Sequence, residues 1–269
     1  MSKLLSDFLV RATSAAVLGT VMLAAILLGG VWGTAVLAAV IAFAALSEFY
    51  ALSRRDPRRP AEVLGLAAAV ALPLAAAYNG ATGLLTVLGS TAAASLVLHV
   101  TFRAARLADT AIALFGVVYA GFTLAHLVLI RNLSDGMTLV LIMVVSVWVN
   151  DVFAYLAGSM LGRTPLAPRI SPKKTWEGLA AGTIATSAVW IVAGSIFTPL
   201  QWPILLAAGV AASAAAAIGD LAESRFKREF AVKDSGRLLP GHGGFLDRFD
   251  SFILVTIVTY HVLSALGVR

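Results

Sequence analysis

The sequence predicts an all-α, polytopic integral membrane protein: a helical bundle of about nine transmembrane helices with a cytoplasmic N-terminus. Three observations predict this fold class. The chain is 59% hydrophobic and only 13% charged, whereas an ordinary soluble domain is about 25% charged. Its apolar residues form runs of roughly 20, the length that crosses a bilayer. Its basic residues gather in alternate connecting segments.

Runs of apolar residues define the predicted spans. They cover about 12–30, 33–52, 61–78, 82–101, 110–130, 137–158, 176–197, 202–220 and 251–267. The third and fourth are the weakest, because Pro73 and the Tyr78-Asn79-Gly80 turn interrupt them.

The N-terminal segment resembles a signal peptide, since Lys3 and Arg11 precede an apolar run. That run is long and has no clear cleavage site before the next span, so we interpret it as an uncleaved anchor. Residues 2–11 carry their leucines and Phe8 on one side, which predicts a short helix in the membrane interface.

The distribution of positive charge fixes the predicted orientation. With the N-terminus in the cytoplasm, 18 of the 20 basic residues fall in cytoplasmic segments, and only Arg131 and Arg269 do not. Lys and Arg accumulate on the cytoplasmic side of membrane proteins. The sequence therefore predicts a multi-pass protein of the inner (cytoplasmic) membrane whose polar loops, 162–175 and 221–250, face the cytoplasm.

Composition excludes several function classes. The chain has no cysteine, so disulfides, thiolate catalysis and cysteine-ligated metal centres are excluded. The net charge of +6 is explained by the cytoplasmic loops, and we expect membrane lipids and no nucleic acid as partners. Small-residue-rich spans such as 205–219 favour close helix packing, within one chain or in a homodimer. We divide the chain into N-terminal transmembrane helices, 1–145, and a catalytic region, 146–269.

The acidic residues near the predicted cytoplasmic face indicate a cation site. Asp220 and Glu223 are three residues apart and Lys227 follows four after Glu223, so on a continuing helix they share a face. Asp247 and Asp250 are also three apart, at the start of the last span, so their side chains can converge on one cation; plain helix N-capping is the alternative. Oxygen-only ligands of this kind suit Mg²⁺, which takes one or two carboxylates together with substrate phosphate.

Two polar segments accompany these acids. The first is Ser171-Pro-Lys-Lys-Thr-Trp-Glu-Gly178, which follows Asp151 and in which Thr175 is placed to cap the next helix; a plain membrane-surface anchor is the alternative. The second is the glycine-rich stretch around His242, whose backbone N–H groups suit an anion. The sequence therefore indicates phosphate chemistry at one membrane face.

The stretch from Ser224 to Asp250 resembles the signature of the phosphatidate cytidylyltransferases, also called CDP-diacylglycerol synthases. That signature reads Ser-x-apolar-Lys-Arg, four residues, Lys-Asp-x-small, two residues, apolar-Pro-x-His-Gly-Gly-apolar-x-Asp-Arg-apolar-Asp, and this chain fits it throughout. The resemblance covers about 146–255. The family often has two small residues after the upstream aspartate, where this chain has Val152 and Phe153.

The resemblance implies that CTP and phosphatidate give CDP-diacylglycerol and pyrophosphate. It implies Asp220, Asp247 and Asp250 as ligands of Mg²⁺, with room for a second cation, and Lys227 as a further catalytic residue. The implied substrate-binding residues are Asp151, Ser171, Lys173, Lys174, Ser224, Arg228, Lys233, Asp234, His242, Gly243, Gly244 and Arg248.

Two other function classes remain as alternatives. A membrane phosphotransferase of the CDP-alcohol type has an Asp-Gly…Ala-Arg…Gly…Asp…Asp arrangement that this sequence lacks. An ion-coupled transporter places charge near the middle of its spans, whereas here the charges gather at the predicted cytoplasmic edge.

Overall fold

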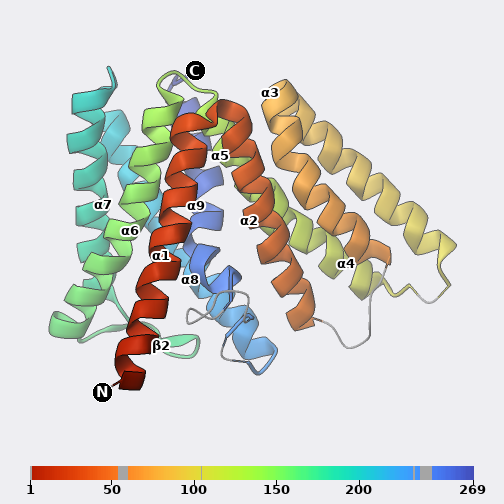
Figure 1. The fold of residues 1–269 in the computed structure, drawn as a ribbon, viewed down its shortest axis with the longest axis horizontal. Helices are drawn as coiled ribbons and strands as arrows, with labels where there is room; N and C mark the ends of the chain where they lie inside the picture. Colours follow the sequence, from red (N-terminus) through yellow and green to blue (C-terminus); the bar gives the residue numbers. More distant parts are fainter. Residues whose placement is uncertain (1, 54–59, 104, 233, 237–243) are drawn as a thin grey trace. The chain divides into compact units, whose positions relative to one another are not determined.

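The computed structural model describes the chain apart from residues 1, 54–59, 104, 233 and 237–243 (Figure 1). The structure is 84% helical, which confirms the predicted all-α membrane fold. It separates into two compact units: Met1–Val128 with Phe230–Phe249, and Leu129–Glu229 with Asp250–Arg269. These bounds differ from the functional division at 145/146, which stays a prediction.

The first unit is built from helices near the N-terminus. They are α1 (Ser2–Leu28), α2 (Gly30–Ser53), α3 (Pro60–Thr101), α4 (Leu107–Gly116), the π-helical turn η1 (Val117–Phe122) and the start of α5 (Thr123–Arg131). Helix α2 begins at Gly30, whose φ of 61° is a left-handed conformation that favours glycine. Residues 2–11 are helical, but they form the first turns of α1 and not a separate interfacial helix.

Helix α3 consists of two arms that meet at a break. Asn79 (φ −140°, ψ 27°) and Gly80 (φ 56°, ψ −142°) leave the helical region, and Figure 1 shows the arms, in orange and yellow, on either side of this point. The turn predicted at Asn79-Gly80 is therefore confirmed. Pro73 lies inside the first arm without ending it.

The second unit contains α6 (Gly136–Leu161), a hairpin of β1 (Pro165–Ala167) and β2 (Ser171–Thr175), α7 (Trp176–Phe197), α8 (Trp202–Glu229) and most of α9 (Leu246–Ala265). The strands pair antiparallel, with Pro165 opposite Thr175. Thr175 ends the hairpin and caps α7, since its hydroxyl accepts a hydrogen bond from Gly178 N at 3.2 Å. The helix start predicted at Thr175 is confirmed, whereas the hairpin replaces a predicted loop.

Six of the described helices are long and apolar enough to cross a membrane, which makes the chain a multi-pass membrane protein. They begin at Gly30, Ala61, Leu107, Gly136, Trp176 and Trp202. The broken α3 counts once among them, although its span Ala61–Thr101 has 41 residues, about twice the roughly 20 that one crossing needs. The total of about nine spans and the cytoplasmic N-terminus stay predictions.

The predicted polar loop 221–250 is shorter than expected. Helix α8 continues to Glu229 and α9 begins at Leu246, so helix occupies both ends of that segment. Pairs of opposite charge four residues apart favour the extension: Lys227 Nζ lies 2.5 Å from Glu223 Oε2, and Arg225 Nε lies 2.9 Å from Glu229 Oε1.

A buried polar network joins α6, α7 and α8 in the second unit. Asn150 Oδ1 accepts hydrogen bonds from Ser213 Oγ at 2.8 Å and Thr186 Oγ1 at 3.3 Å. One turn earlier on α6, Ser146 Oγ accepts from the indole of the fully buried Trp190 at 3.1 Å. Polar side chains in an apolar bundle bond across helices in this way because hydrocarbon offers them no partner. The network fixes the three helices that carry the cavity described next.

Candidate active site

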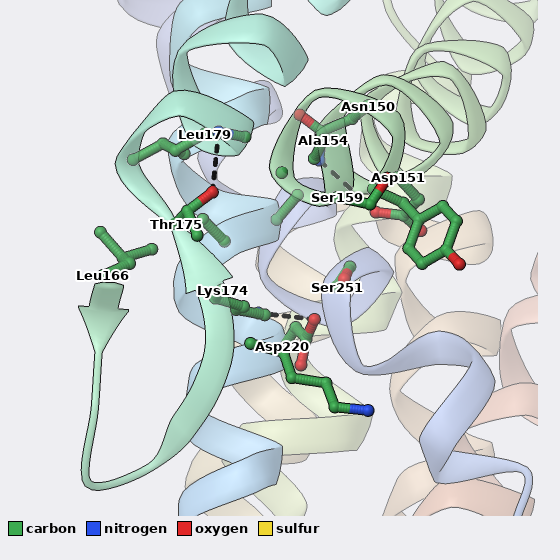
Figure 2. Close-up of a pocket in the computed structure, with 16 residues that line it drawn as sticks. Asn150, Asp151, Ala154, Ser159, Leu166, Lys174, Thr175, Leu179, Asp220 and Ser251 are labelled. Carbon is green, nitrogen blue, oxygen red and sulfur yellow. Dashed lines mark hydrogen bonds and ion pairs between the residues drawn. The ribbon is translucent and has the colours of Figure 1, made fainter. Parts of the chain in front are cut away.

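A cavity of about 580 Å³ lies in the second unit, within the range typical of small-molecule sites. Helices α6, α7, α8 and α9 and strands β1 and β2 contribute to its wall (Figure 2). Apolar side chains form much of the lining, and the polar groups are Asn150, Asp151, Tyr155, Ser159, Lys173, Lys174, Thr175, Asp220 and Ser251. The cavity therefore combines apolar walls with a few charged groups of both signs.

Glycines allow the elements around the cavity to approach closely. A Cβ on Gly178 of α7 would lie 2.7 Å from Ala154 O and 3.3 Å from Gly158 Cα, both on α6. A Cβ on Gly219 of α8 would lie 2.5 Å from Asp250 O on α9. Only glycine permits these contacts. The contact at Gly219 brings the next residue, Asp220, close to Asp250.

Asp220 forms both an ion pair and a side-chain hydrogen bond at the cavity. Its Oδ2 lies 2.5 Å from Lys174 Nζ, the ion pair marked in Figure 2, and its Oδ1 accepts a hydrogen bond from Ser224 Oγ at 3.3 Å. The Asp220 side chain is 37% exposed and that of Lys174 is 24% exposed. Helix α8 and strand β2 thus hold an acid and a base in contact at the cavity wall, and both residues are predicted site residues.

Two further carboxylates crowd this ion pair. Asp250, one turn into α9 and ahead of the predicted span 251–267, experiences repulsion from Asp220 and from Asp151. Burial, followed by the Asp220 carboxylate, raises the pKa of Asp250 above its ordinary range. Lys174 is the cation that offsets this repulsion. Three acids around one lysine leave an excess of negative charge that a cation would relieve.

The two large residues that follow Asp151 do not obstruct the site. Val152 is 53% exposed and Phe153 is 49% exposed, so both turn away from the packed helices. Asp151 lines the cavity, and Asn150 Nδ2 lies 3.5 Å from its Oδ1. This departure from the family pattern therefore leaves the packing of α6 against α7 intact.

Part of this donor set fits Mg²⁺. Within the described part of the chain, no group of three His, Asp or Glu side chains is arranged to hold a metal ion. Mg²⁺ needs fewer, because it binds through one or two carboxylates and completes its shell with water and substrate phosphate. Asp220 and Asp250 meet this smaller requirement in chemistry and mutual proximity. Asp247 belongs to the first unit, so its place beside them stays a prediction.

A second carboxylate cluster lies in the first unit, where the predicted metal ligand Asp247 is tied to its own segment. Its Oδ2 accepts hydrogen bonds from Ser235 N at 2.9 Å, Ser235 Oγ at 3.0 Å and Gly244 N at 2.9 Å. Ser235 Oγ also lies 3.0 Å from Oε2 of Glu48 on α2, and that oxygen accepts from Leu246 N at 2.8 Å. Within the first unit, Ser235 and Leu246 of the signature are therefore anchored to α2.

Lys227, predicted to be catalytic, has a structural partner. Its ammonium pairs with Glu223, whose side chain is only 1% exposed, on the same face of α8. The shared face predicted for this pair is confirmed. A role for Lys227 at substrate phosphate stays a prediction.

The remaining predicted site residues are dispersed. Lys173 lines the cavity, and Ser171 is half-buried at the start of β2. Arg228, Asp234 and Arg248 are exposed, and Gly244 is buried in the first unit. Three predicted residues, Lys233, His242 and Gly243, lie outside the described residues.

Three residues of these clusters have no site role predicted from the sequence. Asn150 and Ser251 line the cavity, and Glu48 contacts the signature segment across 187 residues of chain. The position of Asn150, a polar amide next to Asp151 within an apolar span, is a signal in the sequence that could have identified it. No local pattern connects Glu48 with Ser235.

Comparison with known proteins gives matches along almost the whole chain. The family model described as Cytidylyltransferase family matches residues 9–266. The chain is 36% identical over 259 residues to a phosphatidate cytidylyltransferase of Brucella abortus biovar 1, covering 95% of this chain and 93% of that protein. It is 40% identical over 153 residues to a phosphatidate cytidylyltransferase of Bacillus subtilis, covering 55% of each. The likeness thus extends beyond the motifs at 146–255 to the N-terminal helices.

Proposed function

The chain belongs to the cytidylyltransferase family, and we propose that it transfers the cytidylyl group of CTP to phosphatidate. The products are CDP-diacylglycerol and pyrophosphate. Relatives that bear the name phosphatidate cytidylyltransferase support this substrate pair. The resemblance of Ser224–Asp250 to the family signature supports it independently of the fold.

One observation carries the proposal: Asp220, Asp250 and Asp151 crowd a single lysine at the wall of a cavity with apolar sides. Both substrates are strongly anionic, and phosphatidate also carries acyl chains. A site for them needs cationic groups that offset phosphate charge and an apolar surface beside them. Lys173 and Lys174 supply cationic groups at the cavity wall, and residues such as Leu166 and Leu179 supply apolar surface.

Mg²⁺, when bound, would neutralise the phosphates of CTP and so lower the cost of bringing two anions together. Asp220 and Asp250 are the residues that would hold it, with Asp247 as the third ligand that the family resemblance implies. A second cation would find its ligands among the same groups. Lys174, which pairs with Asp220 at the cavity wall, would offset the charge of a substrate phosphate bound there.

The reaction needs little covalent help from the protein. An oxygen of the phosphatidate phosphomonoester attacks the α-phosphorus of CTP, a new P–O bond forms, and the bond to the bridging oxygen of pyrophosphate breaks. The attacking oxygen is already anionic, so no strong general base is required. The chain's own residues contribute by holding the two phosphates in line and by offsetting their charge. The remaining basic residues proposed for this task are Lys227, Arg228, Lys233 and Arg248.

We place this chemistry at the cytoplasmic face of the inner membrane. CTP is cytosolic, and the basic residues of the chain gather in the segments that the positive-inside rule assigns to that side. A reporter fused after Arg59 should therefore be cytoplasmic. An external reporter would overturn both the span count and the orientation.

The test of function is an assay of the detergent-purified protein with phosphatidate, radiolabelled CTP and Mg²⁺. We expect label in a CDP-lipid and release of pyrophosphate, both abolished by a chelator and restored by excess Mg²⁺. Label transfer that survives complete chelation would remove the metal from the proposal. Release of CMP from added CDP-diacylglycerol and an alcohol would instead identify a CDP-alcohol phosphotransferase.

A further inference from the structure

We propose that Glu48 of α2 is a positioning residue, which holds the start of α9 and the Ser235 hydroxyl so that Asp247 is presented in one orientation. The proposal rests on the proposed function, in which Asp247 acts on the metal and the CTP phosphates. All groups involved belong to the first unit: Glu48 on one side, and Ser235, Gly244, Leu246 and Asp247 on the other.

Glu48 is buried, with 4% of its surface exposed, although a carboxylate at the end of a span normally reaches water. Its Oε2 accepts a hydrogen bond from Leu246 N at 2.8 Å, and Leu246 is the first residue of α9. The first N–H groups of a helix have no partner within it, and a carboxylate there also complements the helix dipole. Glu48 therefore caps α9 from a helix about 200 residues earlier in the sequence.

The Ser235 hydroxyl joins Glu48 to Asp247. Its oxygen lies 3.0 Å from Glu48 Oε2 and 3.0 Å from Asp247 Oδ2, and it accepts from Asp247 N at 3.3 Å. A hydroxyl has one proton to donate, so the two carboxylates share a single donor. A change at Glu48 therefore alters the hydrogen bond that the Ser235 hydroxyl donates to Asp247.

Two glycines of the signature show that this contact constrains the sequence. A Cβ on Gly236 would collide with the carboxylate carbon of Glu48, at 2.5 Å. A Cβ on Gly244 would lie 2.7 Å from Glu48 Oε2 and would also collide with the Ser235 hydroxyl. The small residues at these positions leave room for a carboxylate that arrives from α2. The residues next to these glycines in the sequence do not reveal that Glu48 is the reason they must be small.

Hydrogen exchange tests the contact without reference to activity. In Glu48→Ala the Leu246 amide loses its acceptor, and we expect it to exchange roughly tenfold faster, with Ser235 N–H and Gly244 N–H also faster. Glu48→Gln keeps an acceptor oxygen and should stay close to the wild type. Thr34→Ala removes a buried hydroxyl from the same helix, 14 residues away, and should leave all three amides unchanged.

The Mg²⁺ dependence of CDP-lipid synthesis separates positioning from plain stabilisation. Loss of a group that orients a metal ligand typically costs 10–100-fold in metal affinity or activity. We expect Glu48→Ala to need about tenfold more Mg²⁺ for its half-maximal rate, and Glu48→Gln and Thr34→Ala to behave like the wild type. Ser235→Ala should also raise the Mg²⁺ concentration needed for the half-maximal rate. The double variant Glu48→Ala/Ser235→Ala should need no more Mg²⁺ than the more affected single variant, since both substitutions act through one contact.

Two results would overturn the proposal. Unchanged exchange at Leu246 in Glu48→Ala would remove the contact itself. Faster exchange with an unchanged Mg²⁺ requirement and an unchanged rate of CDP-lipid synthesis would show that Glu48 only caps α9. If the wild type makes no CDP-lipid under any condition, the proposed function fails, and the exchange data alone decide whether Glu48 holds this segment.

Discussion

The two units use carboxylates in opposite ways. In the first unit, Glu48 and Asp247 accept hydrogen bonds from a hydroxyl and from backbone N–H groups of Ser235, Gly244 and Leu246. In the second unit, Asp250 faces the like charges of Asp220 and Asp151. The first arrangement is satisfied by fixed donors of the protein, and the second is left with excess negative charge.

This difference separates carboxylates whose orientation the protein fixes, among them the proposed metal ligand Asp247, from carboxylates that still need a cation. Fixed donors lock a carboxylate in place, which suits a residue that must orient others. Crowded carboxylates cost stability unless a cation joins them, so a fold retains them where they serve binding or catalysis. The following predictions would break or sharpen this comparison.

The largest effect should follow removal of one crowded acid. Asp250→Asn should lower CDP-lipid synthesis by about 10³-fold or more, because a metal ligand is lost. The variant should melt at the same temperature as the wild type or higher, since repulsion from Asp220 is relieved. Activity and thermal unfolding in detergent measure the two effects. Asp135→Asn, an exposed aspartate at the far end of α6, serves as the control and should change neither.

A comparable loss of activity with a different structural outcome is expected for Asp247→Asn. The amide oxygen can still accept from Ser235 and Gly244, so the segment should remain folded while the charge for the metal is gone. We expect a loss of about 10²–10³-fold in rate at wild-type thermal stability. Near-normal turnover of this variant and of Asp250→Asn would refute the metal site.

Lys174 should matter less than either aspartate. Lys174→Met removes the cation paired with Asp220 and one group proposed for substrate phosphate. We expect turnover to fall by about 10–10²-fold, with partial recovery in Lys174→Arg, because a cation that is not a metal ligand is one of several. Equal activity of Lys174→Met and the wild type would show that the ion pair is only structural.

The smallest effect concerns the buried network. Asn150→Ala leaves the hydroxyls of Ser213 and Thr186 without their shared acceptor. In membrane bundles such bonds are worth about 0.6–1.7 kcal/mol, so the free energy of unfolding should fall by about 1 kcal/mol. Ser159→Ala, at an exposed position on the same helix, should change it by less than about 0.5 kcal/mol. A loss above about 4 kcal/mol would mean that Asn150 does more than bridge helices.

Local patterns were sufficient to predict much of the fold. Helix α7 begins and ends where expected, at Trp176 and Phe197, because Thr175 caps it and an apolar run follows. Helix α8 continues past residue 220 to Glu229, and the helical spacing of Glu223 and Lys227 is the signal for this extension, whereas the density of charge in 221–250 favours a loop. The hairpin was missed because Pro165 and Pro172 are typical of loops and turns.

The candidate site could be predicted only in part, and the limit is physical. Asp220, Lys174 and Asp151 were identified as residue types suited to phosphate and metal, and the structure places them around one cavity. Their ion pair depends on how β2 meets α8, which no spacing in the sequence reveals. The link from Glu48 to Ser235 depends on a contact between segments 187 residues apart.

The binding of Mn²⁺ to the detergent-purified protein, followed by electron paramagnetic resonance, tests the central claim most directly, because Mn²⁺ takes the same oxygen ligands as Mg²⁺. Wild-type protein should bind Mn²⁺ in a manner that excess Mg²⁺ reverses, Asp135→Asn should bind equally, and Asp250→Asn should bind at least about tenfold more weakly. Equal binding by the wild type and Asp250→Asn would contradict the claim that the crowded carboxylates hold the cation.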